Sequence, residues 1–151
     1  MRIYIDTSVV GGYFDDEFSA DTKALFKRLE KGEVVFVVSD LMLNELENAP
    51  ASVKELKQYS PDNLEYVFET ADSESLAYRY IEDNIIGASN LGDCRHIALA
   101  TINNVYVLAS WNFKHIVNLY RIKGYNSVNL KIGYNIIEIR NPKELLIYET
   151  I

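Results

Sequence analysis

Four side chains in this sequence carry oxygen atoms that could act together on a cation: those of Asp6, Glu45, Asp93 and Asn112. Carboxylate and amide oxygens are the ligands that Mg²⁺ and Mn²⁺ prefer, with one or two bound directly and others through water. Acids gathered in one place repel each other, so a bound metal ion would account for them. The chemistry would then be hydrolysis, with the ion positioning a water and lowering its pKa.

Each of the four residues also has an ordinary structural interpretation. Asp6 opens a run of small polar residues of the kind found in turns. Glu45 falls within the apolar arc of a helix, where an unpaired carboxylate is costly, although a place at the rim would let it reach solvent. Asp93 stands in the first turn of a helix, where the helix dipole favours a carboxylate, and Asn112 suits an N-cap. The occurrence of all four residues in one chain favours a functional role over these structural ones.

Strand-like and helix-like segments alternate along the chain. Apolar, β-branched or aromatic runs predict short strands, and apolar residues three to four positions apart predict helices between them. The predicted strands are residues 2–6, 34–38, 64–68, 105–109 and 136–139. The predicted helices are residues 22–29, 40–48, 51–59, 73–85, 92–103 and 112–122, and a turn is predicted at 142–144.

Strands separated by helices are typical of βαβ units. We therefore expect a three-layer α/β/α architecture with a central, mainly parallel sheet of four to five strands, in one domain over residues 1–151. In such sheets, ligands bind beyond the carboxyl ends of the strands. Asp6 and Asn112 each follow a predicted strand, so both are expected at this edge.

The composition excludes several classes of protein. With 151 residues, 48% of them hydrophobic and 25% charged, the chain has the make-up of a globular domain. No run approaches the roughly 18 apolar residues of a membrane span, and Asp6 comes too early for a secretory signal. The single cysteine, Cys94, fits a reducing compartment. A cytoplasmic location is therefore expected.

The charge is unevenly distributed. The formal net charge is −7, with a strong acidic excess up to Ala109 and a small basic excess from Ser110 onward. Phosphate affinity depends on Lys and Arg. An acidic chain that acts on nucleic acid therefore needs a metal ion or a local basic patch.

Two histidines offer a different chemistry. His96 and His115 could serve as general acid and base of a metal-free ribonuclease. The simpler expectation is a helix-surface contact between His96 and Asp93, and a helical position for His115. Arg95 and Lys114 could contact phosphate, but solvated helix faces are the commoner place for single cations.

The remaining notable residues are expected to be structural. Cys94 lies in an apolar stripe and predicts core packing, as do Tyr4 and Tyr106 within predicted strands. The pair Gly11-Gly12 lacks the spacing of a phosphate-binding loop, and no Cys/His zinc spacing occurs. The acidic run of residues 15–17 is expected to be solvated.

Four short segments together carry a family resemblance. They are Tyr4-Ile5-Asp6-Thr7-Ser8, Leu43-Asn44-Glu45-Leu46, Gly92-Asp93-Cys94-Arg95-His96-Ile97-Ala98-Leu99-Ala100-Thr101 and Val107-Leu108-Ala109-Ser110-Trp111-Asn112-Phe113. In this order they resemble a PIN domain, the nuclease fold of VapC-type toxins, as far as about Asn118. The resemblance implies an endoribonuclease that uses Mg²⁺ or Mn²⁺ and leaves 5′-phosphate and 3′-hydroxyl ends on RNA. It also implies a homodimer, and a small antitoxin protein as the partner of a type II toxin–antitoxin pair.

The resemblance assigns roles residue by residue. The three acids of the family that would hold the metal fall on Asp6, Glu45 and Asp93. The hydroxyl after the first acid falls on Thr7, with Ser8 beside it, and Ser110 is the hydroxyl before the fourth position. That fourth position, often Asp, is Asn112 here, and an amide contributes an oxygen without a charge.

Two other functions remain open on the sequence. The loss of one acid and the acidic charge are compatible with a catalytically weakened PIN domain that binds RNA or protein. A phosphatase of the haloacid-dehalogenase type also begins with a strand that ends in Asp. Against it, Asp6 lacks a second Asp two positions further on.

Overall fold

The computed structural model describes residues 1–59 and 61–147. Within these residues, five parallel strands form one sheet in the order β3-β2-β1-β4-β5. The strands are β1 (Arg2–Ile5), β2 (Val35–Ser39), β3 (Leu64–Val67), β4 (Val107–Ala109) and β5 (Ile139–Arg140). The predicted architecture and the predicted strand number are confirmed.

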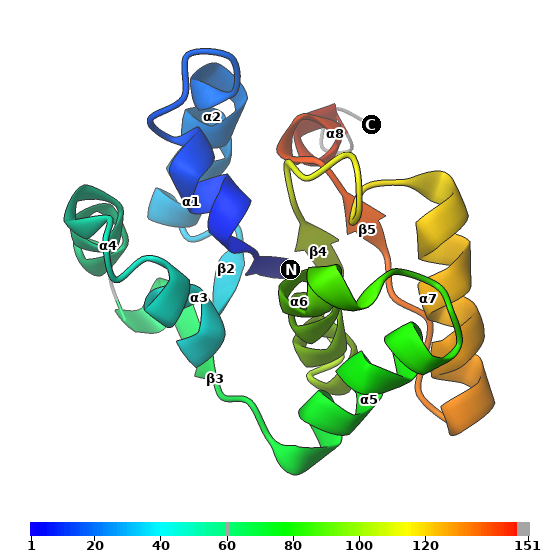
Figure 1. Cartoon of the computed structure of the whole chain (residues 1–151). Coiled ribbons are helices and arrows are strands. Elements are labelled where there is room, and N and C mark those ends of the chain that lie inside the picture. Colours follow the sequence, from blue (N-terminus) through cyan, green and yellow to red (C-terminus); the bar gives the residue numbers. More distant parts are fainter. Residues whose placement is uncertain (60, 148–151) are drawn as a thin grey trace.

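Helices cover both faces of the sheet (Figure 1). Residues of α1, α2, α4 and α8 share a core with one face, and those of α5, α6 and α7 share a core with the other. The helices are α1 (Thr7–Gly12), α2 (Ser19–Glu30), α3 (Asp40–Glu45), α4 (Pro50–Lys57), α5 (Ala71–Glu82), α6 (Leu91–Ile102), α7 (Leu119–Ile132) and α8 (Pro142–Ile147), with short 3₁₀ turns η1 (Pro61–Asn63) and η2 (Ala88–Asn90).

The central strand β1 is buried on both faces because successive side chains of a strand point to opposite sides. Ile3 and Ile5 pack into the core under α1 and α2, whereas Tyr4 packs into the core under α5 and α6. All three side chains are fully buried. Apolar runs on inner strands are typical of parallel sheets covered on both faces.

The order of the strands creates a switch point beside β1. The chain runs from β1 outward through β2 to β3, and then returns to place β4 on the other side of β1. The residues that follow β1 and β4 therefore lie side by side, and the Asp6 N–H donates to the Ala109 carbonyl at 3.4 Å. This is the position at which open α/β sheets bind ligands.

The predicted helix over residues 112–122 is wrong for residues 112–118, because the helix there, α7, begins at Leu119. Asn112 accepts hydrogen bonds from the N–H groups of Lys114 and His115, and Asn118 separately caps α7 by accepting from Arg121 N–H. Each Asn side chain closes its own turn, so the segment divides into a short loop and a longer, later helix. His115 consequently lies in the loop and not on a helix.

Smaller differences concern the ends of elements and one exposed side chain. α3 ends at Glu45 and not near residue 48, and the predicted turn at 142–144 is the start of α8. Tyr106, expected in the core, is 68% exposed because it precedes β4 at the amino edge of the sheet. Cys94 is fully buried, as expected.

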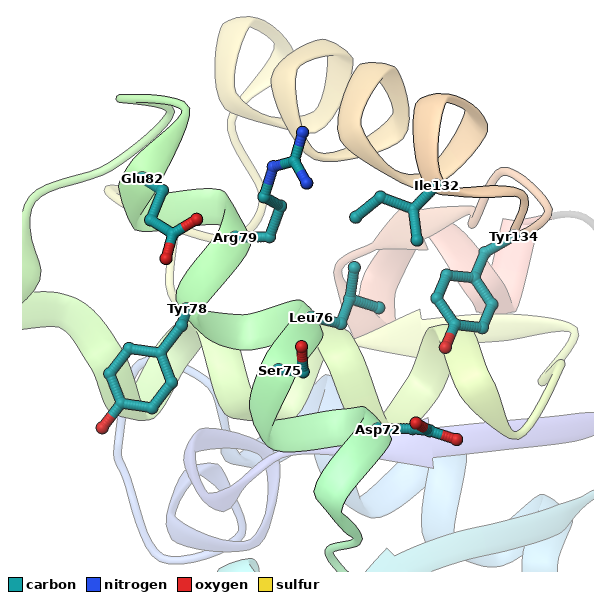
Figure 2. Close-up of a pocket in the computed structure, with 8 residues that line it drawn as sticks. All are labelled: Asp72, Ser75, Leu76, Tyr78, Arg79, Glu82, Ile132 and Tyr134. Carbon is teal, nitrogen blue, oxygen red and sulfur yellow. The ribbon is translucent and has the colours of Figure 1, made fainter.

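Two further features bear on function. In the part of the chain that the structure describes, no helix is long and apolar enough to cross a membrane. A cavity of about 470 Å³ lies between α5 and the end of α7, where Arg79, Ile132 and Tyr134 are among its lining residues (Figure 2). None of the residues proposed from the sequence for the site lines it.

Candidate active site

Asp6 is both a helix cap and the most buried acid of the site. It follows β1, and its Oδ1 accepts from the backbone N–H of Val9 at 3.2 Å and the Ser8 hydroxyl at 2.6 Å. Its Oδ2 accepts from the Ser110 hydroxyl at 2.5 Å. Burial raises the pKa of Asp6 above its usual value, although the charge of His96 and these hydrogen bonds act in the opposite direction. The ordinary cap interpretation is therefore correct, and it does not compete with a functional one.

Two serine hydroxyls connect Asp6 to the loop after β4. Ser8 Oγ accepts from the Trp111 N–H at 2.8 Å, and Ser110 Oγ accepts from the Asn112 N–H at 2.9 Å. Each hydroxyl thus accepts from the loop backbone and donates to the Asp6 carboxylate. The direction and position of that carboxylate are therefore fixed by α1 and by the loop after β4.

Glu45 is the last residue of α3, and both of its carboxylate oxygens are hydrogen-bonded. Thr7 Oγ1 donates to Oε2 at 3.0 Å, and His96 Nε2 lies 2.7 Å from Oε1. Burial would raise the pKa of Glu45, but the hydrogen bond and charge of His96, with the hydrogen bond of Thr7, hold it below its usual value. The side chain is 39% exposed, so Glu45 is an ionised carboxylate that reaches solvent.

The interpretation of His96 as a surface residue is wrong. Its side chain is 3% exposed, and its two ring nitrogens contact Glu45 and, at 2.7 Å, the Tyr4 hydroxyl. The Tyr4 hydroxyl in turn lies 2.8 Å from Ser39 Oγ. A signal for burial was present in the sequence, since His96 stands directly before the continuous apolar run of residues 97–100 in a largely buried helix.

Asp93 and Asn112 form the other half of the site. Asp93 lies in the first turn of α6, and burial raises its pKa. The negative charges of Asp6 and Glu45 raise it further, while His115 and His96 act in the opposite direction. The contact from Asn112 Nδ2 to Asp93 Oδ1 is long, at 3.4 Å.

The amide oxygen of Asn112 does not face the acids. It accepts from the backbone N–H groups of Lys114 at 3.2 Å and His115 at 3.0 Å. Those two donors fix the orientation of the amide, because the nitrogen could not accept from them. Asn112 therefore caps the loop with its oxygen and presents its NH₂ group to Asp93.

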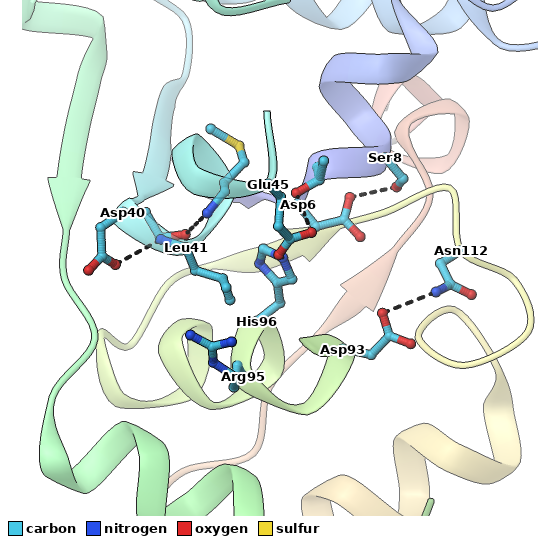
Figure 3. A network of polar contacts seen from close by, with 12 residues as sticks. Asp6, Ser8, Asp40, Leu41, Glu45, Asp93, Arg95, His96 and Asn112 are labelled. Carbon is cyan, nitrogen blue, oxygen red and sulfur yellow. Dashed lines mark hydrogen bonds and ion pairs between the residues drawn. The ribbon is translucent and has the colours of Figure 1, made fainter. Parts of the chain in front are cut away.

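The structure brings Asp6, Glu45 and Asp93 from three different elements to one edge of the sheet (Figure 3). The negative charges of Asp6 and Glu45 both raise the pKa of Asp93, which therefore lies within electrostatic reach of both. Among residues 1–59 and 61–147, however, no three His, Cys, Asp or Glu side chains stand close enough to hold one metal ion. The place of Asp6 at this edge was predictable from the end of its strand, whereas direct ligation of one ion by all three side chains is not present in the described part of the chain.

The chemistry of the donor set nonetheless fits Mg²⁺ or Mn²⁺. These ions are commonly held by one or two carboxylates with water in the remaining positions. Asp6 and Asp93 both have pKa values raised by burial, a penalty that a nearby cation would offset. In addition, His115 Nδ1 is a buried polar atom with no hydrogen-bond partner among the described residues, so this side of the site has unused polar capacity.

Residues around the site have structural duties. Arg95 forms a bidentate ion pair with Glu69, so the expectation of a solvated cation is wrong. Gly12 lies against Trp111, where an added Cβ would stand 2.8 Å from the indole ring. Gly12 is therefore needed for packing. Residues 15–17 are exposed, as expected.

Comparison with known proteins identifies the fold. No family model matches the sequence, and no curated protein sequence matches it. Three solved structures are similar. VapBC2 from Rickettsia felis, bound to a promoter DNA fragment, has a TM-score of 0.59 and 16% identity over 93% of this chain and 98% of that one. VapC20 from Mycobacterium tuberculosis, a toxin that cleaves the sarcin–ricin loop, has a TM-score of 0.57 and 17% identity over 74% and 91%.

The third structure, FitAcB from Neisseria gonorrhoeae, has a TM-score of 0.56 and 15% identity over 93% of this chain and 97% of that one. All three matches are with PIN-domain toxins of the VapC and FitB type. The fold expected from the four short segments is therefore confirmed as a PIN-domain, VapC-like fold.

Proposed function

We propose that this protein is a metal-dependent endoribonuclease and the toxin of a type II toxin–antitoxin pair. The observation that supports the proposal most strongly is the meeting of Asp6, Glu45 and Asp93 at the switch point of the sheet. The fold is shared with VapC20, which cleaves the sarcin–ricin loop, and with the VapBC2 and FitAcB proteins. An antitoxin, a second copy of this chain and RNA are the partners that this proposal includes.

In this proposal, the acids and the hydroxyls of the site have different roles. Asp6 and Asp93 would hold the ion, and Glu45 would reach it directly or through water. When bound, Mg²⁺ or Mn²⁺ supplies charge that stabilises the phosphate and lowers the pKa of water. Glu45, ionised and partly exposed, orients the attacking water and accepts its proton. The hydroxyls of Ser8 and Ser110 keep Asp6 in place while the charge on the phosphate changes.

The test is RNA cleavage by the purified chain after removal of any bound partner. Cleavage should require Mg²⁺ or Mn²⁺, stop in chelator, leave 3′-hydroxyl ends and be lost in Asp6→Asn. A histidine mechanism would instead use the 2′-hydroxyl and leave a cyclic phosphate. Cleavage that persists in chelator with cyclic ends would overturn the proposal.

A catalytically weakened domain that binds RNA or protein is the second candidate. It is favoured by Asn112, which supplies a cap in place of a fourth carboxylate, and by the lack of a ready-made three-ligand group in the described residues. If the partner-free chain binds labelled single-stranded RNA but leaves varied RNAs intact with Mg²⁺ and Mn²⁺, this second function is correct.

A further inference from the structure

We propose that His96, held by Tyr4, is a positioning residue that fixes the Glu45 carboxylate in its working orientation. The inference rests on the proposed function, because it concerns how Glu45 serves the cation and the water. His96 is not one of the acids, and among them Glu45 is the one that it contacts directly. Figure 3 shows the His96 ring directed from α6 toward Glu45.

His96, Tyr4 and Ser39 form a buried chain of hydrogen bonds behind Glu45. The ionised Glu45 carboxylate can only accept, so His96 Nε2 carries a proton and donates to it. On its other side, His96 Nδ1 and the Tyr4 hydroxyl share a hydrogen bond of 2.7 Å. The Tyr4 hydroxyl also shares one with Ser39 Oγ, which accepts from the Met42 N–H. Every polar atom of this buried chain has a partner.

The hydrogen-bonded partners are buried, whereas Glu45 is not. Tyr4 and Ser39 are fully buried, on β1 and at the end of β2, and His96 is 3% exposed. Glu45 is 39% exposed at the last position of a short helix, where its side chain would otherwise sample several rotamers. His96, held by buried groups of the sheet, therefore fixes the Glu45 carboxylate, which α3 does not restrain. Hydrogen-bond partners of metal-binding carboxylates typically change metal affinity or activity by about 10–100-fold when they are removed.

A matched pair of substitutions separates positioning from packing. In His96→Gln, the amide NH₂ group can occupy the place of Nε2 and still donate to Glu45, whereas the shorter side chain of His96→Asn can reach Tyr4 but not Glu45. Both remove the ring from the same buried site. We expect Mn²⁺ affinity measured by calorimetry to fall about 10–100-fold in His96→Asn and to change less than about threefold in His96→Gln. The kcat for RNA should fall in the same order, with KM little changed.

A double-mutant comparison shows whether His96 acts through Glu45. In a Glu45→Gln background, the further change His96→Asn should leave Mn²⁺ affinity nearly unaltered. Tyr4→Phe, which releases Nδ1 but keeps Nε2, should weaken Mn²⁺ binding less than His96→Asn does. Thermal melting and circular dichroism establish that each variant is folded.

Several outcomes would overturn the inference. Equal Mn²⁺ affinities in wild type and folded His96→Asn would do so, as would equal losses in His96→Asn and His96→Gln or additive effects of His96→Asn and Glu45→Gln. A wild type that binds no Mn²⁺ overturns both this inference and the proposed metal mechanism. If the wild type binds Mn²⁺ with the expected pattern among variants but cuts no RNA, the proposed function fails and the positioning role of His96 stands.

Discussion

The two halves of the candidate site differ in how completely their polar atoms are engaged. Around Asp6 and Glu45, hydroxyls and His96 approach the carboxylates at 2.5–3.0 Å from several elements. At Asp93, Asn112 provides one contact at 3.4 Å. Both halves contain a carboxyl whose pKa is raised by burial and lowered by the charge of His96, but at Asp6 the hydrogen bonds of Ser110, Ser8 and Val9 lower it further, whereas at Asp93 the charge of His115 does so.

This difference indicates that hydrogen bonds of the protein fix the half with Asp6 and Glu45, the well-organised half, whereas the half with Asp93 and Asn112 becomes ordered when a ligand binds. Pre-formed hydrogen bonds keep a reacting group in position without reorganisation during the reaction. A half-buried carboxylate with a single long contact is suited to bind a cation that arrives from solvent. The comparison therefore predicts distinct responses of the two halves to substitution, to metal and to pH.

The half of the site formed by Asp93 and Asn112 is the loosely held half. A substitution in it is expected to have the largest effect, and that effect is on catalysis. Asp93→Asn should lower RNA cleavage at least about 100-fold, because even indirect partners of a metal site are worth 10–100-fold. Glu47→Gln, at an exposed carboxylate two residues after Glu45, is the control and should cleave as the wild type does. If Asp93→Asn cleaves RNA normally, the two halves do not form one site.

Metal should produce the next largest effect, on thermal stability. A ligand that binds only the folded chain at 100 times its Kd adds about 2.7 kcal/mol. At roughly 2–4 °C per kcal/mol for a chain of this size, Mn²⁺ should raise Tm by about 5–10 °C. The shift should be greatly reduced in Asp6→Asn and in Asp93→Asn. The absence of any shift at millimolar Mn²⁺ would contradict the metal proposal for both halves.

Without metal, the loosely held half should make the protein less stable at neutral pH. Burial and the charges of Asp6 and Glu45 raise the pKa of Asp93 in the folded chain. The folded state thus binds the proton more tightly than the unfolded state, and stability is lost as pH rises from the unfolded pKa, near 3.8, through the folded value. Metal-free Asp93→Asn should therefore melt a few degrees higher than wild type at pH 7, at about 2–4 °C per kcal/mol.

Acid provides the control for this stability difference. Below about pH 3.8 the carboxyl is protonated in both states, so the advantage of Asp93→Asn should disappear. Melting curves in chelator across the acid range measure it. A variant that is less stable than wild type at pH 7 would show that the Asp93 carboxylate already has enough compensation without metal.

The sequence predicted the well-organised half better than the other half, and the reason is physical. Asp6 follows an apolar strand, and the carboxyl ends of parallel strands meet at one edge, so its location follows from the fold class. The contact between His96 and Glu45 was missed because most of the surface of α6 is buried. A functional side chain on such a helix is not distinguished by its pattern from residues that only pack. α7 was missed beyond residue 122 because Leu119 and Leu130 are exposed and blur the apolar period.

The orientation of the Asn112 amide could not be predicted, because one side chain satisfies two requirements with different atoms. The four-segment resemblance puts it at an acidic position, and the N-cap propensity of Asn puts it at a turn. In the structure, the amide oxygen caps the turn and the amide nitrogen contacts Asp93. No pattern of residue types distinguishes which atom faces which neighbour, since that depends on the path of the loop after β4.

The smallest expected effects come from a pair of substitutions at Asn112. Asn112→Ala removes the acceptor for the Lys114 and His115 N–H groups and should cost about 1 kcal/mol, or about 2–4 °C in Tm, with Mn²⁺ affinity nearly unchanged. Asn112→Asp keeps the acceptor but replaces a donor that faces Asp93 with a negative charge. It should therefore lower metal-free stability by repulsion and tighten Mn²⁺ binding.

Melting curves in chelator and calorimetric Mn²⁺ affinities for the two Asn112 variants decide between cap and ligand. At an effective dielectric near 20, two unit charges about 4 Å apart interact by roughly 4 kcal/mol before desolvation, so even a small part of this energy is measurable as a change in Mn²⁺ affinity. A marked loss of affinity in Asn112→Ala would mean that the amide turns its oxygen toward the ion when metal is present. Unchanged affinity in both variants would mean that the cation lies beyond the reach of residue 112, nearer to Asp6 and Glu45, and the well-organised half would then be the whole of the metal site.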